Sequence, residues 1–84
     1  MKHVRLSEHA RARLQLRGTN EEEVRSAVHR GVREGAKQGR SMCRLNFRYN
    51  QMWRGKQYAI KQVAPVILER PHEIVVVTVY TFFF

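Results

Sequence analysis

Apolar residues recur with a helical period in the first third of the chain. Ser7 is a suitable N-cap for a helix over residues 8–17, and Gly18 stands where a left-handed C-terminal cap is needed. Asn20, with a glutamate three residues later, forms a capping box that opens a second helix, which ends near Gly31. These signals predict a short helical hairpin.

Beyond the helices the period changes to two, which is typical of β-strands. Residues 43–49 alternate between apolar side chains and cationic or polar ones. Further strands are predicted at Tyr58–Val63 and Val66–Leu68, with Pro65 between them marking a bend or a sheet edge. The segment 32–41, rich in glycine and charge, is predicted as a loop or a weak edge strand.

The last part of the chain is its most apolar segment. Ile74–Phe82 is dense in β-branched and aromatic residues, which predicts a central strand buried on both faces. The end, Val79–Phe84, could complete that strand or form an exposed docking patch, and we favour the strand. Together these patterns predict a single α+β domain over residues 1–84, with the helical hairpin packed on an antiparallel sheet of three to four strands.

Charge adds a second constraint. The 84 residues include sixteen Lys and Arg against seven acidic residues, which gives a formal net charge of +9. Twelve of the basic residues and five of the acidic ones lie within residues 1–50, so positive charge is concentrated toward the N-terminus. Most of the cations are arginines, whose planar guanidinium suits bidentate contacts with phosphate or carboxylate. This balance indicates a polyanionic partner, which is nucleic acid or an acidic protein that imitates it.

Other site classes receive little support from the composition. Cys43 is the single cysteine, which excludes an internal disulfide and argues against a cysteine-based metal site. No apolar run approaches the roughly 20 residues that span a bilayer, and no secretory leader pattern opens the sequence. We therefore expect a cytoplasmic protein that needs no metal or other cofactor and does not bind a membrane.

The first helix carries a stripe of cations. At about 100° per residue, Glu8 and two further polar residues gather on one side, which marks it as the solvent side. His9, Arg13 and Arg17, spaced four apart, lie at the centre of the opposite side, which is predicted to face the domain. Because buried, unpaired guanidinium groups are strongly destabilising, these arginines need acidic partners or a hydrated cleft.

Two interpretations of this stripe stay open. In the first it is a structural ion-pair cluster, in which Glu23, Glu69 or Glu73 pairs with the arginines. In the second it lines a cleft for RNA. There His9 would accept or donate a proton during RNA cleavage, while the arginines neutralise charge growing on the phosphate. Such chemistry requires no metal.

Both ends of the chain resemble a known bacterial family. The first stretch, Leu6 to Val28, includes Leu-Ser-Glu-His-Ala, Arg13, Arg17-Gly18 and Glu-Glu-Glu-Val, and the second is the closing Val77-Thr78-Val79-Tyr80. These are similar to the opening and the last strand of domain-of-unknown-function family 4258, whose members are small proteins. That family is grouped with the RelE-like toxins of the barnase, colicin and RelE ribonuclease superfamily.

The resemblance carries expectations of its own. It implies a RelE-like fold of helices followed by an antiparallel sheet, and metal-independent RNA cleavage. It also implies a partner, since members are commonly encoded beside a small antitoxin-like protein. Matched by position, His9, Arg13 and Arg17 fall on the family's helix motif, and Thr78 and Tyr80 fall on its last strand. The implied catalytic set is the helix stripe with Tyr80, which would orient the phosphate or assist proton transfer.

Further RNA contacts are predicted on the strands. Arg44, Arg48 and Lys61 are candidate phosphate contacts, although cations on a solvated sheet face give the same pattern. Thr78 is a fourth candidate because it alternates with Tyr80 onto one sheet face. Three other aromatic residues could stack on bases or pack in the core or a turn. They are Tyr49, Trp53 and Tyr58.

Three functions therefore compete, in this order. The first is an mRNA-cleaving ribonuclease toxin of a toxin–antitoxin system, acting by general acid/base catalysis. The second is a non-catalytic RNA-binding module. The third is an interaction protein whose basic face binds an acidic partner. The expected partners are thus RNA and an antitoxin protein encoded nearby.

Overall fold

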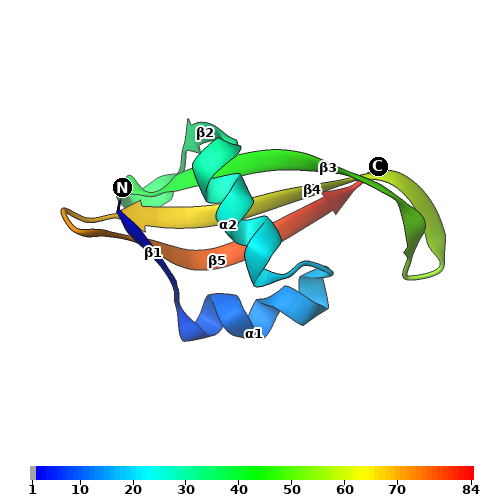
Figure 1. The fold of residues 1–84 in the computed structure, drawn as a ribbon, viewed down its shortest axis with the longest axis horizontal. Helices are drawn as coiled ribbons and strands as arrows, with labels where there is room; N and C mark the ends of the chain where they lie inside the picture. Colours follow the sequence, from blue (N-terminus) through cyan, green and yellow to red (C-terminus); the bar gives the residue numbers. More distant parts are fainter. Residues whose placement is uncertain (1) are drawn as a thin grey trace.

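Within residues 2–84, which the computed structural model describes, two helices pack on a five-stranded sheet (Figure 1). In chain order the elements are β1 (His3–Leu6), α1 (Glu8–Arg17), α2 (Glu21–Arg30), β2 (Val32–Gly35), a 3-10 turn (Lys37–Gly39), β3 (Ser41–Trp53), β4 (Lys56–Glu69) and β5 (Glu73–Phe83). Helix α2 crosses the sheet over β3 and β4, while α1 runs beside β5.

The helices begin and end where their capping residues predict. The Ser7 side-chain oxygen accepts a hydrogen bond of 3.0 Å from the backbone N–H of Ala10, and the Asn20 side chain accepts one of 2.8 Å from Glu23. Gly18 closes α1 with a φ of 71°, a left-handed conformation that glycine adopts without steric penalty. Local signals alone therefore define both helices.

The sheet is mixed, and the predicted RelE-like antiparallel sheet of three to four strands is wrong. The strand order is β1-β5-β4-β3-β2, in which β1 runs parallel to β5 and the other neighbours are antiparallel. In the parallel pair, Val4 lies opposite Ile74 and Leu6 opposite Val76. The sequence prediction omits β1 because four residues with only two alternating apolar positions do not separate a strand from the lead into a helix.

Pro65 lies inside a long strand and not at a bend or an edge. β4 runs unbroken through it, between β3 and β5, and Pro65 is buried opposite Val79. Proline has no N–H to donate to a sheet ladder. The ladder between β3 and β4 is interrupted around it, with Met42 opposite Val66 on one side and Leu45 opposite Val63 on the other. At this gap the strand does not need the N–H that proline lacks, so β4 continues through Pro65 and the two predicted strands form a single one.

β5 is a central strand in its first half only, and the prediction that Ile74–Phe82 is buried on both faces is wrong for the second half, where Tyr80 and Phe82 are exposed. Its first half lies between β1 and β4, and Ile74, Val75 and Val76 are all buried. The strand continues to Phe83, so the apolar end of the chain is a strand, as favoured above. β2, at the opposite edge of the sheet, is an edge strand that covers only the first part of the segment 32–41, for which a loop or a weak edge strand was predicted.

Both helices cover the same face of the sheet. Ala10 of α1 and Val24 of α2 belong to one buried cluster with Val63, Val76 and Val79 of the strands. The other face, called the open face below, is covered by neither α1 nor α2. Neither α1 nor α2 has the length and the apolar composition that crossing a membrane requires.

Candidate nucleic-acid interface

Strand register decides which side chains reach the open face. Directly opposed residues of antiparallel strands point to the same side of a sheet. Leu45, Val63 and Thr81 are opposed and point toward the helices, because Val63 is in the core and the Thr81 hydroxyl donates to the Arg17 carbonyl. The alternating residues of the three strands therefore lie on the open face. They include Met42, Arg44, Asn46 and Arg48 of β3, Gln62, Ala64 and Val66 of β4, and Thr78, Tyr80 and Phe82 of β5.

Four of the predicted site residues share this surface. Arg44 and Arg48 project from β3, and Thr78 and Tyr80 project from β5. Tyr80, in the second half of β5, is 39% exposed. The open face thus presents an aromatic ring and cations together without a covering layer.

Arg17 reaches the open face from α1, which lies along the free edge of β5. The backbone N–H of Ser7 donates to the Val76 carbonyl at 3.0 Å at one end of α1, and the Thr81 hydroxyl donates to the Arg17 carbonyl at 2.6 Å at the other. From there the Arg17 Cζ lies 5.6 Å from the centre of the Tyr80 ring, a cation–π contact. Its Nε is buried and has no hydrogen-bond acceptor within residues 2–84.

The predicted orientation of α1 needs correction. Its buried side is centred on Ala10, with Leu14 packed against the core, whereas His9 is exposed and Arg13 and Arg17 are half-buried. Ala10, which has no exposed surface, allows the helix to approach β5 closely, and this rotation leaves the arginines half-buried and not fully enclosed, where desolvation of their charge would cost more. His9, Arg13 and Arg17 therefore form a flank of α1 and not the centre of its inward face.

This flank lies on the side of α1 that points away from α2. Arg11, on the other flank, donates to Glu21 of α2 at 2.7 Å. His9 and Arg13 lie on the Arg17 side, two turns and one turn before the contact with Tyr80. The stripe therefore follows the flank of α1 that faces away from α2, called the rim below, and Arg17 at its C-terminal end contacts Tyr80 of the open face.

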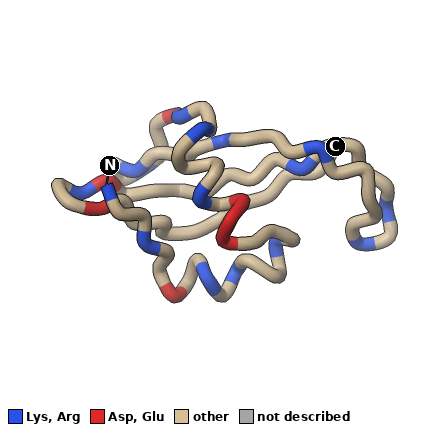
Figure 2. The backbone as a smooth tube through the Cα atoms, in the orientation of Figure 1, with Lys and Arg blue, Asp and Glu red and all other residues tan. Residues whose placement is uncertain are grey.

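The acidic residues considered as partners of the stripe bind other cations. These ion pairs join Glu69 to Lys2 and Arg33, Glu73 to Arg5, and Glu23 to Lys61, with N–O distances from 2.7 to 3.1 Å. Arg13 and Arg17 have no carboxylate partner among residues 2–84. Figure 2 shows acidic segments at the start of α2 and at the sheet end near the N-terminus, whereas α1 beyond its first turn is basic. The structural ion-pair cluster is therefore not formed.

Three of the paired carboxylates make stability depend on pH. The pKa values of Glu21, Glu69 and Glu73 lie below the ordinary glutamate value because arginine or lysine side chains donate hydrogen bonds to them. A lowered folded-state pKa adds stability above the unfolded value of about 4.3, and this is lost as the pH falls through the folded-state pKa. We expect the urea midpoint to fall below about pH 4.3, and less steeply in Glu69→Gln than in the exposed-site control Glu8→Gln. A midpoint that stays constant on acidification would contradict this origin of stability.

Lys61, predicted as a phosphate contact, lies on the opposite side of the sheet from the open face. It lies on the helix side of β4, opposite Phe47, and is 7% exposed. Its Nζ lies 2.7 Å from a Glu23 carboxylate oxygen and donates to the Gly18 carbonyl at 2.9 Å. A buried ammonium needs such partners because burial removes its water. Lys61 thus ties the turn between α1 and α2 to the sheet.

The three aromatic residues considered for base stacking pack around Phe83. The ring centres of Tyr49, Trp53 and Tyr58 lie 5.4, 5.0 and 5.5 Å from that of Phe83. Trp53 also covers Gly18, where an added Cβ would lie 2.7 Å from the indole. These rings hold the tip of the β3–β4 hairpin against the end of α1, so they serve packing.

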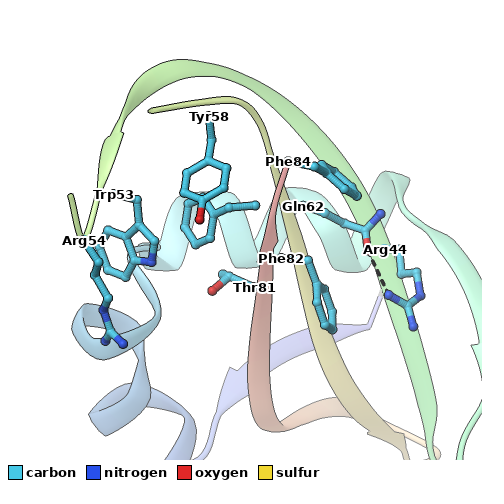
Figure 3. A pocket seen from close by; sticks show the side chains of 9 residues that line it. Arg44, Trp53, Arg54, Tyr58, Gln62, Thr81, Phe82 and Phe84 are labelled. Carbon is cyan, nitrogen blue, oxygen red and sulfur yellow. Dashed lines mark hydrogen bonds between the residues drawn. The ribbon is translucent and has the colours of Figure 1, made fainter. Parts of the chain in front are cut away.

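Two exposed rings from the apolar end of the chain, which were not among the predicted RNA contacts, complete the surface. Phe82 and Phe84 are 41% and 59% exposed. Figure 3 shows both on the same side of β5 as Gln62 and Arg44. The groove that they line, of about 620 Å³, continues past β5 to Trp53 and Tyr58 on the other side of the strand. A second groove, of about 450 Å³, adjoins Tyr80 and is lined partly by Lys37 and Arg40. The sequence could have placed both phenylalanines on this surface, because they follow Tyr80 at every second residue of the strand.

A row of polar side chains crosses the sheet next to Phe82. Arg44 Nε donates to Glu34 at 2.7 Å, and another of its nitrogens donates to the Gln62 side-chain oxygen at 2.8 Å. The Gln62 amide in turn donates to Asn46 at 2.9 Å. The Arg44 Cζ lies 5.3 Å from the centre of the Phe82 ring. Arg44 is therefore held in place, with its charge partly compensated by Glu34.

The interface combines rings, guanidinium groups and amides, and these groups suit hydrogen bonding, stacking and charge neutralisation. Among residues 2–84, no three side chains of the metal-binding types gather at one point. Comparisons with protein families, with curated proteins and with solved structures find no match to this chain, so the resemblance noted in the sequence stays a prediction.

Proposed function

We propose that this protein binds RNA through its open face. The observation that carries the proposal is the pair of exposed rings on β5, Tyr80 and Phe82, each with an arginine guanidinium against it. Proteins recognise unpaired RNA by stacking bases on aromatic rings and guanidinium planes and by hydrogen bonding to base edges. The neighbouring Gln62 is an amide of the kind that can hydrogen-bond to base edges.

The charge distribution supports a polyanionic ligand. Around the open face several cations lack a carboxylate partner within residues 2–84, so their charge is available to phosphate. They are Arg13 and Arg17 on the rim, Lys37 and Arg40 in the groove beside Tyr80, and Arg48 on β3. We also propose that the protein is cytoplasmic, as its single cysteine predicts.

The test is the salt dependence of RNA affinity. If about four cations each neutralise one phosphate of a single strand, the slope of log affinity against log salt is about −3. We then expect roughly 50-fold weaker binding at about 200 mM than at about 50 mM salt, measured by fluorescence anisotropy. Arg48→Ala should make the slope shallower by about 0.7, whereas Arg30→Ala at the end of α2 serves as the exposed control.

A flat salt profile would contradict the proposal, because phosphate contacts would then not contribute to affinity. Tight binding of an acidic protein without any RNA binding would instead support the interaction-protein alternative. The antitoxin partner implied by the family resemblance would in that case cover the open face.

As a second candidate function we propose metal-independent cleavage of the bound RNA, as in the toxins that the sequence resembles. The observation that favours it is the rim of the open face, where Arg17 contacts Tyr80 and neither Arg13 nor Arg17 is neutralised by a carboxylate within residues 2–84. His9 would remove the proton of a ribose hydroxyl or protonate the leaving oxygen. The arginines would stabilise the charge that grows on the phosphate, and Tyr80 would orient it.

A further inference from the structure

The open face carries a ladder of three aromatic side chains along β5. Tyr80, Phe82 and Phe84 alternate, and each is at least 39% exposed. Phe84 extends the ladder because its N–H donates to the Ile60 carbonyl at 3.1 Å and its carbonyl accepts from Ile60 at 2.8 Å. It therefore faces the same side as Phe82, as Figure 3 shows. Contiguous exposed rings on so small a protein mark an interaction surface.

The spacing of this ladder distinguishes between forms of RNA. Alternate residues of a strand lie about 6.6 Å apart. Stacked bases in a helical strand follow one another at only about 3.4 Å. Consecutive bases of a duplex or a stacked single strand thus cannot each meet one of the three rings. An extended strand with its bases splayed apart can place one base on each ring.

The side chains on the two sides of the ladder differ in chemical type. On the α1 side, Arg17 touches Tyr80 and, with Arg13, has no carboxylate partner within residues 2–84, which suits phosphate. On the side of β4 and β3 lie Gln62 and Arg44, joined by a hydrogen bond and partly compensated in charge. Such polar groups suit the hydrogen-bonding edges of bases. The ladder therefore lies between a phosphate-binding rim and a base-reading row.

We infer that the RNA bound by this protein is an extended single strand, with three consecutive bases stacked on Tyr80, Phe82 and Phe84. Its phosphates lie toward Arg17 and Arg13, and its base edges lie toward Gln62 and Arg44. This inference rests on the proposed function and adds the class of RNA and its orientation on the sheet. It also implies a preference for strands that stack weakly, because base stacking in the free strand opposes binding.

The test compares three labelled RNAs of about ten nucleotides by fluorescence anisotropy. They are oligouridylate, which stacks weakly, oligoadenylate, which stacks strongly, and a duplex of equal length. We expect oligouridylate to bind most tightly and the duplex at least about tenfold more weakly. Phe82→Ala and Tyr80→Ala should each weaken oligouridylate binding by about five- to 100-fold, since each removes one stacking platform. Phe82→Leu keeps the apolar volume without the ring and should show a loss in the same direction.

Met52→Ala is the matched control, because Met52 is 58% exposed on the β3–β4 hairpin and lies off the ladder. Its affinity for oligouridylate should equal that of the parent protein. Equal binding of duplex and single strand, with no effect of the ring variants, would overturn the inference while leaving RNA binding intact. Failure of the parent protein to bind any of the three RNAs would overturn the proposed function itself.

Discussion

Replacing His9 with alanine is expected to lower RNA cleavage by about 10²- to 10⁴-fold, while RNA affinity stays close to that of the parent protein. His9 is exposed on the first turn of α1, on the same flank as Arg13 and Arg17, and Arg17 contacts Tyr80. A proton-transfer group acts in the transition state and not in binding. Affinity, in contrast, depends on the cations and the rings, which this substitution leaves in place.

The measurement is cleavage of a labelled RNA beside anisotropy with the same RNA, after circular dichroism has verified folding. His29→Ala is the matched control, because His29 is an exposed histidine near the end of α2. Its cleavage rate should match that of the parent. Cleavage that persists in His9→Ala would assign proton transfer to another group. RNA binding without cleavage by the parent protein would leave the binding module as the function.

Replacing Lys61 with alanine is expected to lower the free energy of unfolding by about 3 kcal/mol. The substitution leaves the Glu23 carboxylate without its cation and the Gly18 carbonyl without its donor. Removing one partner from a buried ion pair costs about 3–5 kcal/mol, and the 21% exposure of the Glu23 side chain places the effect at the lower end. Urea unfolding followed by circular dichroism gives the value.

Lys56→Ala provides the comparison for Lys61→Ala, since Lys56 is exposed at the start of the same strand. It should change the free energy of unfolding by less than about 0.5 kcal/mol. RNA affinity of Lys61→Ala, measured where the variant is folded, should equal that of the parent protein. An unchanged unfolding midpoint with reduced RNA affinity would return Lys61 to the RNA interface.

The helices could be predicted from sequence because their signals are local. Ser7, Gly18 and Asn20 each act within three or four residues of the helix end that they cap. The parallel pairing of β1 depends instead on a partner about 70 residues away, and nothing in His3–Leu6 specifies it. The prediction of a bend or a sheet edge at Pro65 was wrong because proline is excluded from a central strand only where the ladder needs its N–H. The β3–β4 ladder is interrupted at this position.

The part of the candidate site that lies on the strands could be predicted, because alternate residues of a strand point to the same face of the sheet. Thr78 and Tyr80 share a face because they alternate, and the same rule includes Phe82. Alternation also places Lys61 on the core side, two residues before the buried Val63, but its positive charge suggested exposure. The rotation of α1 was not predictable from the helical period alone, because it depends on how closely Ala10 approaches β5.

The parallel pair of β1 and β5 has a consequence for synthesis of the protein on the ribosome. β1 and the start of α1 are held by β5, as in the hydrogen bond from the Ser7 hydroxyl to the Val77 carbonyl, which spans 70 residues. Contacts of such long range close slowly and cannot form before both partners have left the ribosome. The nascent helices thus have no completed core until β5 emerges. The same strand supplies Tyr80 and Phe82, so the open face with its exposed rings forms only when the core does.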